Sequence, residues 1–139
     1  MIVALDAPSE VFVRRLSEHR WNHATFLKST PTDPITDPEA DDGWLTTLAD
    51  RRIRIRDEVS VADQVLLVAS PGGHAAAAAV IGRACSLKRV TTTALIVGAA
   101  AASDRELSQT LAQLRPWSLM VVIANSDDYV SDMMTALRV

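Results

Sequence analysis

Short apolar runs alternate with amphipathic stretches over the second half of the chain. Three runs of apolar and β-branched residues are typical of strands buried on both faces: 64–70, 90–97 and 119–124. The stretches between them, about 74–87 and 103–115, have helical spacing. The pattern over residues 62–139 therefore predicts a regular βαβαβα unit, with a parallel sheet, right-handed crossovers and helices on its faces.

The ends of the predicted helices carry local signals. Ser103 and Glu106 have the spacing of a capping box, and Pro116 ends the helix that follows. Asn125 or Ser126 is placed to cap a final helix beyond the third strand.

The first sixty residues have a less regular pattern. Residues 2–5 predict a strand, 8–20 a helix with Pro8 in its first turn, and 23–28 another strand. Residues 30–43 contain three prolines and five acidic residues, which predicts an extended loop. We favour a solvated connector over a lid for this loop.

Apolar and cationic residues alternate from Arg52 to Arg56. One face of this segment is apolar and the other is basic, which favours a strand at the edge of the sheet. The basic face suits an anion or an acidic partner, and it suits the acidic loop just upstream equally well.

The chain has 139 residues and a mass of 15.0 kDa, which is the size of one domain. We predict a single α/β domain over residues 1–139, a Rossmann-like three-layer sandwich with a mostly parallel sheet of about five strands. Alanine supplies 21 residues, and five of them follow one another at 75–79. Side chains this small allow the predicted helix to lie close to the sheet.

Charge and hydropathy narrow the classes of partner. Lys and Arg number 14 against 17 Asp and Glu, so the basic excess typical of nucleic-acid binding is missing. The longest apolar run, 94–102, is too short for a membrane helix, and the first residues lack a signal-peptide pattern. We expect a cytoplasmic homo-oligomer that binds neither nucleic acid nor membranes, with its three tryptophans as core or interface anchors.

Cysteine and histidine give little indication of chemistry. Cys85 lies in an apolar stretch with no His or Asn beside it, which favours a buried thiol over a reactive nucleophile. His19 and His23 are four residues apart, but no further ligand accompanies them, so we predict no metal site.

The carboxyl ends of the predicted parallel strands define the candidate ligand site, because ligands of open parallel sheets bind outside these ends. The turn Ser70-Pro71-Gly72-Gly73-His74 leads from a buried strand into a helix, and its glycines and the helix start can present amides to a phosphate or carboxylate. Asp6, after the first strand, reaches the same edge. The residues predicted to bind the ligand are Ser70, Gly72, Gly73, His74, Gly98, Asn125, Ser126 and Asp127.

Known phosphate-binding and catalytic motifs are incomplete in this chain. The turn lacks the lysine of a Walker A loop and the three spaced glycines of the dinucleotide fingerprint. Ser70, His74 and Asp127 or Asp128 are placed to meet as a catalytic triad, but Val68 stands where a nucleophile elbow needs glycine. The first turn of the last helix, where carboxylates stabilise the helix dipole, explains the two acids adequately. Acceptance of hydrogen bonds from a ribose or sugar hydroxyl is the functional alternative.

The function that these patterns favour is binding of a small anion, such as a nucleotide or a phosphorylated metabolite, with no reaction and no cofactor assigned. The alternative is a protein-interaction or regulatory subunit without a small-molecule ligand, whose glycines serve only the packing of helix on sheet. A small hydrolase that uses Ser70 and His74 is a third hypothesis.

Overall fold

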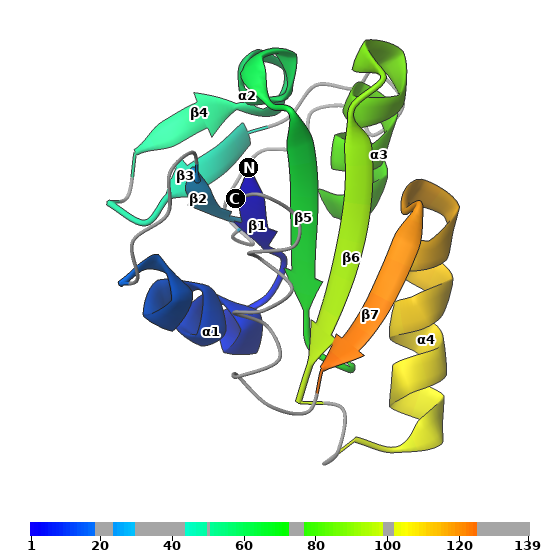
Figure 1. Ribbon diagram of the computed structural model, residues 1–139. Helices are drawn as coiled ribbons and strands as arrows, with labels where there is room; N and C mark the ends of the chain where they lie inside the picture. Colours follow the sequence, from blue (N-terminus) through cyan, green and yellow to red (C-terminus); the bar gives the residue numbers. More distant parts are fainter. Residues whose placement is uncertain (19–23, 30–43, 50, 73–76, 99–101, 125–139) are drawn as a thin grey trace.

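The strands of the computed structural model form one mixed sheet (Figure 1). The residues described are 1–18, 24–29, 44–49, 51–72, 77–98 and 102–124. Within them the strands are β1 (Ile2–Ala4), β2 (Phe26–Lys28), β3 (Trp44–Thr47), β4 (Arg52–Arg54), β5 (Gln64–Ala69), β6 (Thr91–Val97) and β7 (Met120–Ala124). Their order across the sheet is β4-β3-β2-β1-β5-β6-β7.

The sheet has a parallel part and an antiparallel extension. β2, β1, β5, β6 and β7 are parallel neighbours, whereas β3 runs antiparallel to both β2 and β4. The prediction of about five strands matches the parallel part alone. The sheet of the described residues has seven strands because the hairpin of β3 and β4 extends it beyond β2.

The described residues also form four α-helices and one short 3-10 helix. They are α1 (Ala7–Ser17), α2 (Ile55–Val61), α3 (Ala77–Lys88), α4 (Asp104–Leu114) and η2 (Arg115–Trp117). In this part of the chain, no helix combines the length and the apolar character needed to cross a membrane. The predicted loop at 30–43 and the predicted final helix after Asn125 lie outside the described residues.

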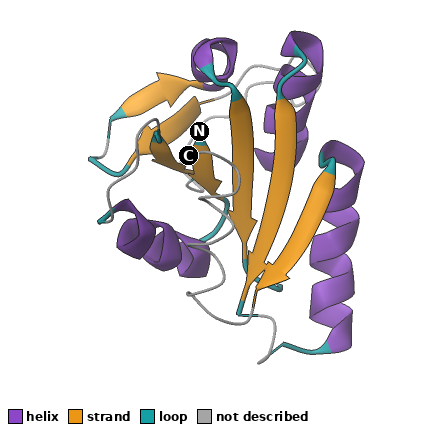
Figure 2. Ribbon diagram, viewed as in Figure 1, coloured by secondary structure: helices purple, strands orange, loops and turns teal. Residues whose placement is uncertain are grey.

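Alternation of side chains along the strands places the core on both faces of the sheet. Ile2 of β1 and Leu66 of β5 point to one face, where they pack with Phe12 of α1. Val3 and Leu67, one position further along each strand, belong to the opposite face with residues of α2, α3 and α4. Helices therefore lie against both faces of the sheet (Figure 2).

The alanine-rich helix packs closely, as its composition predicts. Ala77 and Ala78 of α3 are buried, and Gly82 faces Trp117 of η2. A Cβ at Gly82 would lie only 2.5 Å from the Trp117 Cβ, so no larger residue fits without movement. The guanidinium carbon of Arg83 lies 5.4 Å from the centre of the Trp117 ring, which adds a cation–π contact to this packing.

The predicted capping box at the start of α4 is confirmed for Ser103 only, because Glu106 accepts a bond from the Ser103 hydroxyl and not from its amide. The Ser103 side chain caps α4 by accepting a hydrogen bond from the Glu106 amide at 3.2 Å.

The alternating segment from Arg52 does form the edge strand β4, but only to Arg54, because the chain turns into α2 at Ile55. The sequence did not predict this helix, because the alternation of apolar and cationic residues continues into it to Arg56. The helix buries Ile55 and Val59.

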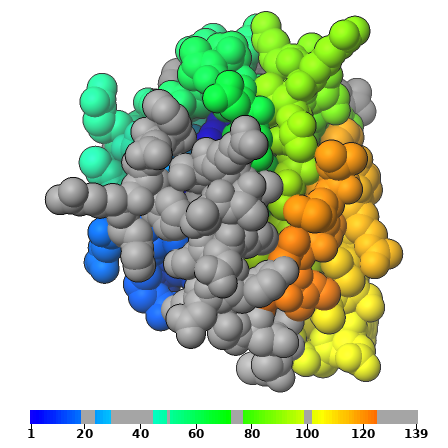
Figure 3. Space-filling model, viewed as in Figure 1, coloured from blue at the N-terminus to red at the C-terminus, as the bar shows by residue number. Residues whose placement is uncertain are grey.

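β7 forms the other edge of the described sheet and exposes apolar side chains. Met120 and Ile123 are 45% and 44% exposed, and Leu119 just before the strand is 82% exposed. Figure 3 shows β7, in orange, at the molecular surface. An exposed apolar edge strand is a ready partner for another chain.

Candidate functional site

The parallel strands bring their carboxyl ends to one edge of the sheet, the lower edge in Figure 1. β1 lies between β2 and β5, so the chain builds the sheet outward from β1 in both directions. The strand order therefore reverses between β1 and β5. This reversal is where ligands of open α/β sheets bind.

Asp6 bridges the two strands at this reversal. Its Oδ1 accepts a hydrogen bond from the Ser9 amide at 2.9 Å, which caps α1, and its Oδ2 accepts one from the Ser70 amide at 2.9 Å. The Ser9 hydroxyl completes a capping box by accepting a bond from the Asp6 amide at 3.2 Å. Both carboxylate oxygens of Asp6 therefore hold backbone amides of the chain itself.

The turn after β5 is held by α4. Gly72 has a φ of +79°, which favours glycine, and its amide donates to the Thr110 hydroxyl at 3.0 Å. A Cβ at Gly72 would lie 2.9 Å from Oε2 of Glu106, so a carboxylate stands beside the turn. The Gly72 amide is therefore satisfied by Thr110 and the Ser70 amide by Asp6, and these are the two amides of the predicted turn site that the structure describes. Gly73 and His74 lie outside the described residues.

The Ser70 side chain carries a polar group that the described part of the fold does not use. Its hydroxyl makes no hydrogen bond within the described part of the chain, and the residue is half-buried. The structure thus separates two roles, because the Ser70 amide is structural while its hydroxyl remains available at the strand reversal.

Gly98, after β6, borders open space. Its φ of +72° again favours glycine, but a Cβ there would meet nothing within 4 Å. Glycine is therefore required by the backbone conformation and not by close packing of the protein. The remaining predicted residues, Asn125, Ser126 and Asp127, lie outside the described residues.

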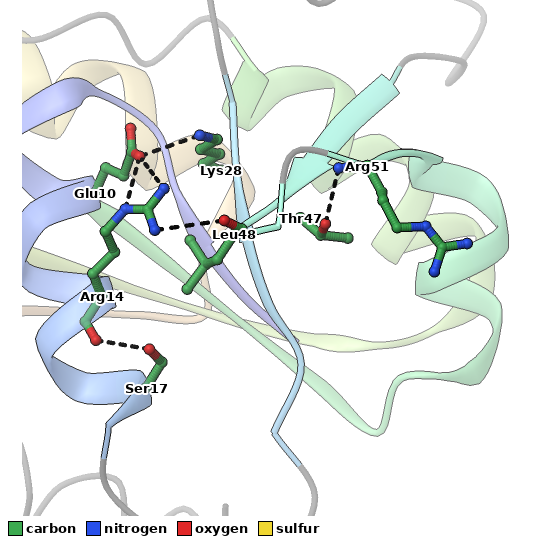
Figure 4. A network of polar contacts seen from close by, with 7 residues as sticks. All are labelled: Glu10, Arg14, Ser17, Lys28, Thr47, Leu48 and Arg51. Carbon is green, nitrogen blue, oxygen red and sulfur yellow. Dashed lines mark hydrogen bonds and ion pairs between the residues drawn. The ribbon is translucent and has the colours of Figure 1, made fainter.

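Lys28 is a residue of this edge that sequence reasoning missed. It ends β2 beside Ala4 of β1, and its side chain is only 11% exposed. Its Nζ lies 3.3 Å from Oε1 of Glu10 in α1, and Arg14 donates to the same oxygen at 3.0 Å (Figure 4). A positive charge is thus buried at the carboxyl edge, one strand away from Asp6.

The same network ties α1 to the antiparallel extension. Figure 4 shows Arg14 reaching the Leu48 carbonyl, at 3.5 Å, just after β3. The Thr47 hydroxyl accepts a bond from the Arg51 amide at 3.1 Å and closes the turn between β3 and β4. No local signal identifies Lys28, because its burial depends on α1 and β2 lying side by side.

Catalytic and metal-binding hypotheses gain no support from the described residues. Of the possible triad, only Ser70 is described. His19 and His23 also lie outside, and the described His, Cys, Asp and Glu residues form no group of three that could hold a metal ion. Cys85 is 1% exposed, which confirms the prediction of a buried thiol. Burial raises the pKa of this thiol, against a smaller lowering by a hydrogen bond with Thr92.

Among the described residues, the carboxyl edge therefore combines the open space at Gly98, a Ser70 hydroxyl without a hydrogen bond, the buried ammonium group of Lys28 and the carboxylates of Asp6 and Glu106. Comparison with known proteins adds no identity to this chemistry: no family model matches the chain, and no curated protein matches it either.

Proposed function

We propose that the chain is a Rossmann-like, three-layer α/β domain that binds a small anionic ligand, such as a nucleotide or a phosphorylated metabolite, at the carboxyl edge. The observation that carries this proposal is the reversal of strand order between β1 and β5, with Asp6 and Ser70 at its two sides. Helices on both faces of the sheet support the Rossmann-like description.

The available groups suggest how such a ligand is held. Because Asp6 and Thr110 occupy the Ser70 and Gly72 amides, the ligand uses the Ser70 hydroxyl and the open space beside Gly98. Lys28 makes the local potential more positive, whereas Glu106 beside the turn suits the hydroxyl groups of a sugar better than a phosphate. A ligand that carries both a phosphate and a sugar fits this arrangement better than a bare anion.

Thermal unfolding in the presence of nucleotides and sugar phosphates tests the proposal. A ligand present at 100 times its dissociation constant stabilises the native state by about 2.7 kcal/mol. Ser70→Asp should abolish the stabilisation, because its carboxylate would face the anion, and Ser70→Asn is the control of equal size without the charge. Equal stabilisation of both variants would place the ligand elsewhere, and no stabilisation by any compound would contradict the proposal.

The second candidate is a protein-interaction subunit, favoured by the exposed apolar edge at β7. In this function the sheet continues into a second copy of the chain along β7. Light scattering gives the oligomeric state of the native protein and of Ile123→Lys. Val11→Lys in α1 is the control, because Val11 is another exposed apolar residue. A dimer that dissociates only in the Ile123 variant supports the interaction subunit, and a monomeric native chain contradicts it.

A further inference from the structure

A cavity lies between α2 and α3, far from the site described above. α2 leads into the amino end of β5 and α3 into the amino end of β6, so both helices approach the opposite edge of the sheet. The two helices pack side by side at the top of Figure 1, and both reach the surface along the upper side of Figure 3. The cavity measures about 300 Å³, near the lower limit of about 300 Å³ for small-molecule sites.

Its lining is apolar at the base and cationic at the rim. The described residues that line it are Arg56, Val59, Ala84, Leu87 and Lys88. Val59 and Ala84 are almost completely buried, whereas Leu87 is 70% exposed although it is large and apolar. No acidic residue is among the described residues that line the cavity.

The two cations have no hydrogen-bond or ion-pair partner among the residues that the structure describes. In this respect they differ from Arg52 and Arg54 on the preceding strand, each of which has an interaction within the protein. Two unpaired positive charges at the rim of one cavity complement an anion.

Helix stability accounts for one of these cations but not for the other. Lys88 lies in the last turn of α3, where the negative end of the helix dipole stabilises a cation. Arg56 lies in the first turn of α2, where the positive end of the dipole opposes it. The place of Arg56 therefore gives no advantage to its own helix, and a charge that is directed at the cavity explains it better.

We propose that this cavity binds an amphipathic anion, a carboxylate or phosphate that carries an aliphatic chain or ring. The apolar part contacts Val59, Ala84 and Leu87, and the anionic group pairs with Arg56 and Lys88. Arginine offers a planar fork of donors that matches two oxygens of such a group, and lysine adds a second point charge.

Three probes separate the contributions of chain and charge. Octanoate has both an aliphatic chain and a negative charge, octanol has only the aliphatic chain, and acetate has only the charge. Chemical-shift mapping with the isotope-labelled protein should show octanoate shifting amides of α2 and α3, with roughly tenfold tighter binding than either partial probe. Octyl phosphate then distinguishes a preference for phosphate from one for carboxylate.

Substitutions at the rim test the charge pairing. Arg56→Gln and Lys88→Gln should each weaken octanoate binding about threefold, and added salt should weaken binding to the native protein. Arg105→Gln is the matched control, because Arg105 is an exposed cation in the first turn of α4 and does not line the cavity. Circular dichroism confirms that each variant retains the native fold.

Each outcome bears on the proposal. Equal affinity for octanoate and octanol would overturn it, and so would equal weakening by Arg105→Gln, which would indicate a response to net charge alone. Shifts at the carboxyl edge instead of α2 and α3 would also overturn it. Because Ser70→Asp leaves this cavity intact, octanoate binding by that variant supports the cavity even if the proposed nucleotide site fails.

Discussion

Removal of the Asp6 side chain should destabilise the fold more than loss of an ordinary helix cap. Asp6→Ala deletes the cap on α1, which is worth about 1 kcal/mol. It also deletes the bond to the Ser70 amide, a hydrogen bond to a charged group that contributes about 1.5 kcal/mol at a half-buried position. The expected loss is therefore about 2.5 kcal/mol in the free energy of unfolding.

Two further variants divide this loss into its parts. Asp6→Ser keeps one acceptor for the cap and removes the link to β5, so it should cost about 1.5 kcal/mol. Ser103→Ala removes the cap of α4, where the Ser103 hydroxyl bonds only to Glu106 of the same helix among the described residues, and should cost about 1 kcal/mol. The assay is urea unfolding at pH 7, followed by far-UV circular dichroism, with unchanged dependence on urea as the check that the two-state description holds.

The decisive comparison is between Asp6→Ala and Ser103→Ala. If the two variants lose equal stability, the link from Asp6 to the end of β5 contributes nothing and its assigned role is wrong. If Asp6→Ser is as destabilised as Asp6→Ala, the cap contributes nothing and the link accounts for the whole loss.

Other predictions concern the buried thiol, the glycines and the buried ion pair. Burial raises the pKa of Cys85 above its ordinary 9.0, so the thiol of the unfolded chain ionises first and the free energy of unfolding falls as the pH rises above 9. Urea unfolding at pH 7 and pH 10 should therefore show a smaller fall for Cys85→Ala than for the native protein. Gly98→Ala should cost about 1 kcal/mol from backbone strain alone, whereas Gly82→Ala should cost about 2 kcal/mol, since its Cβ has no room; thermal unfolding ranks the two variants. Glu10→Gln should cost about 1–2 kcal/mol because Lys28 loses a carboxylate partner, and a double-mutant cycle with Lys28→Met should show coupling between the residues.

The sequence predicted best those elements whose signals are local. β5, β6 and β7 are runs of mostly apolar and β-branched residues, and the start of α4 carries its own cap, so each can be predicted without knowledge of distant partners. The edge position of β4 followed from alternating charge for the same reason.

The elements that were missed depend on contacts between distant segments. β3 has only four residues and becomes a strand by pairing with β2 and β4. Lys28 resembles any surface lysine until α1 covers it. The cap of α1 was missed because the Asp6–Ser9 pair lacks the Glu or Gln of the usual capping box.

For the candidate site, the sequence correctly brought Asp6 and Ser70 to one edge of the sheet but did not predict the contacts that the residues there make. The rule about strand ends placed Asp6 and Ser70 at one edge, and their side-chain–backbone bond shows that they meet. The expected amide cradle was not fully open, because Thr110 comes to Gly72 from a helix 38 residues away. Sequence spacing contains no information about such a long-range bond.

The central position of β1 has a consequence for how the chain folds during synthesis. β1 leaves the ribosome before the other described strands, yet one of its two neighbours, β5, begins 62 residues after β1 does, at Gln64. Until β5 emerges, Ile2, Val3 and Ala4 expose apolar side chains to both faces of an incomplete sheet. Pairing of such distant segments is slow, and unpaired apolar strands favour aggregation. The interval before β5 emerges is therefore the one in which the apolar residues of β1 are most exposed to aggregation.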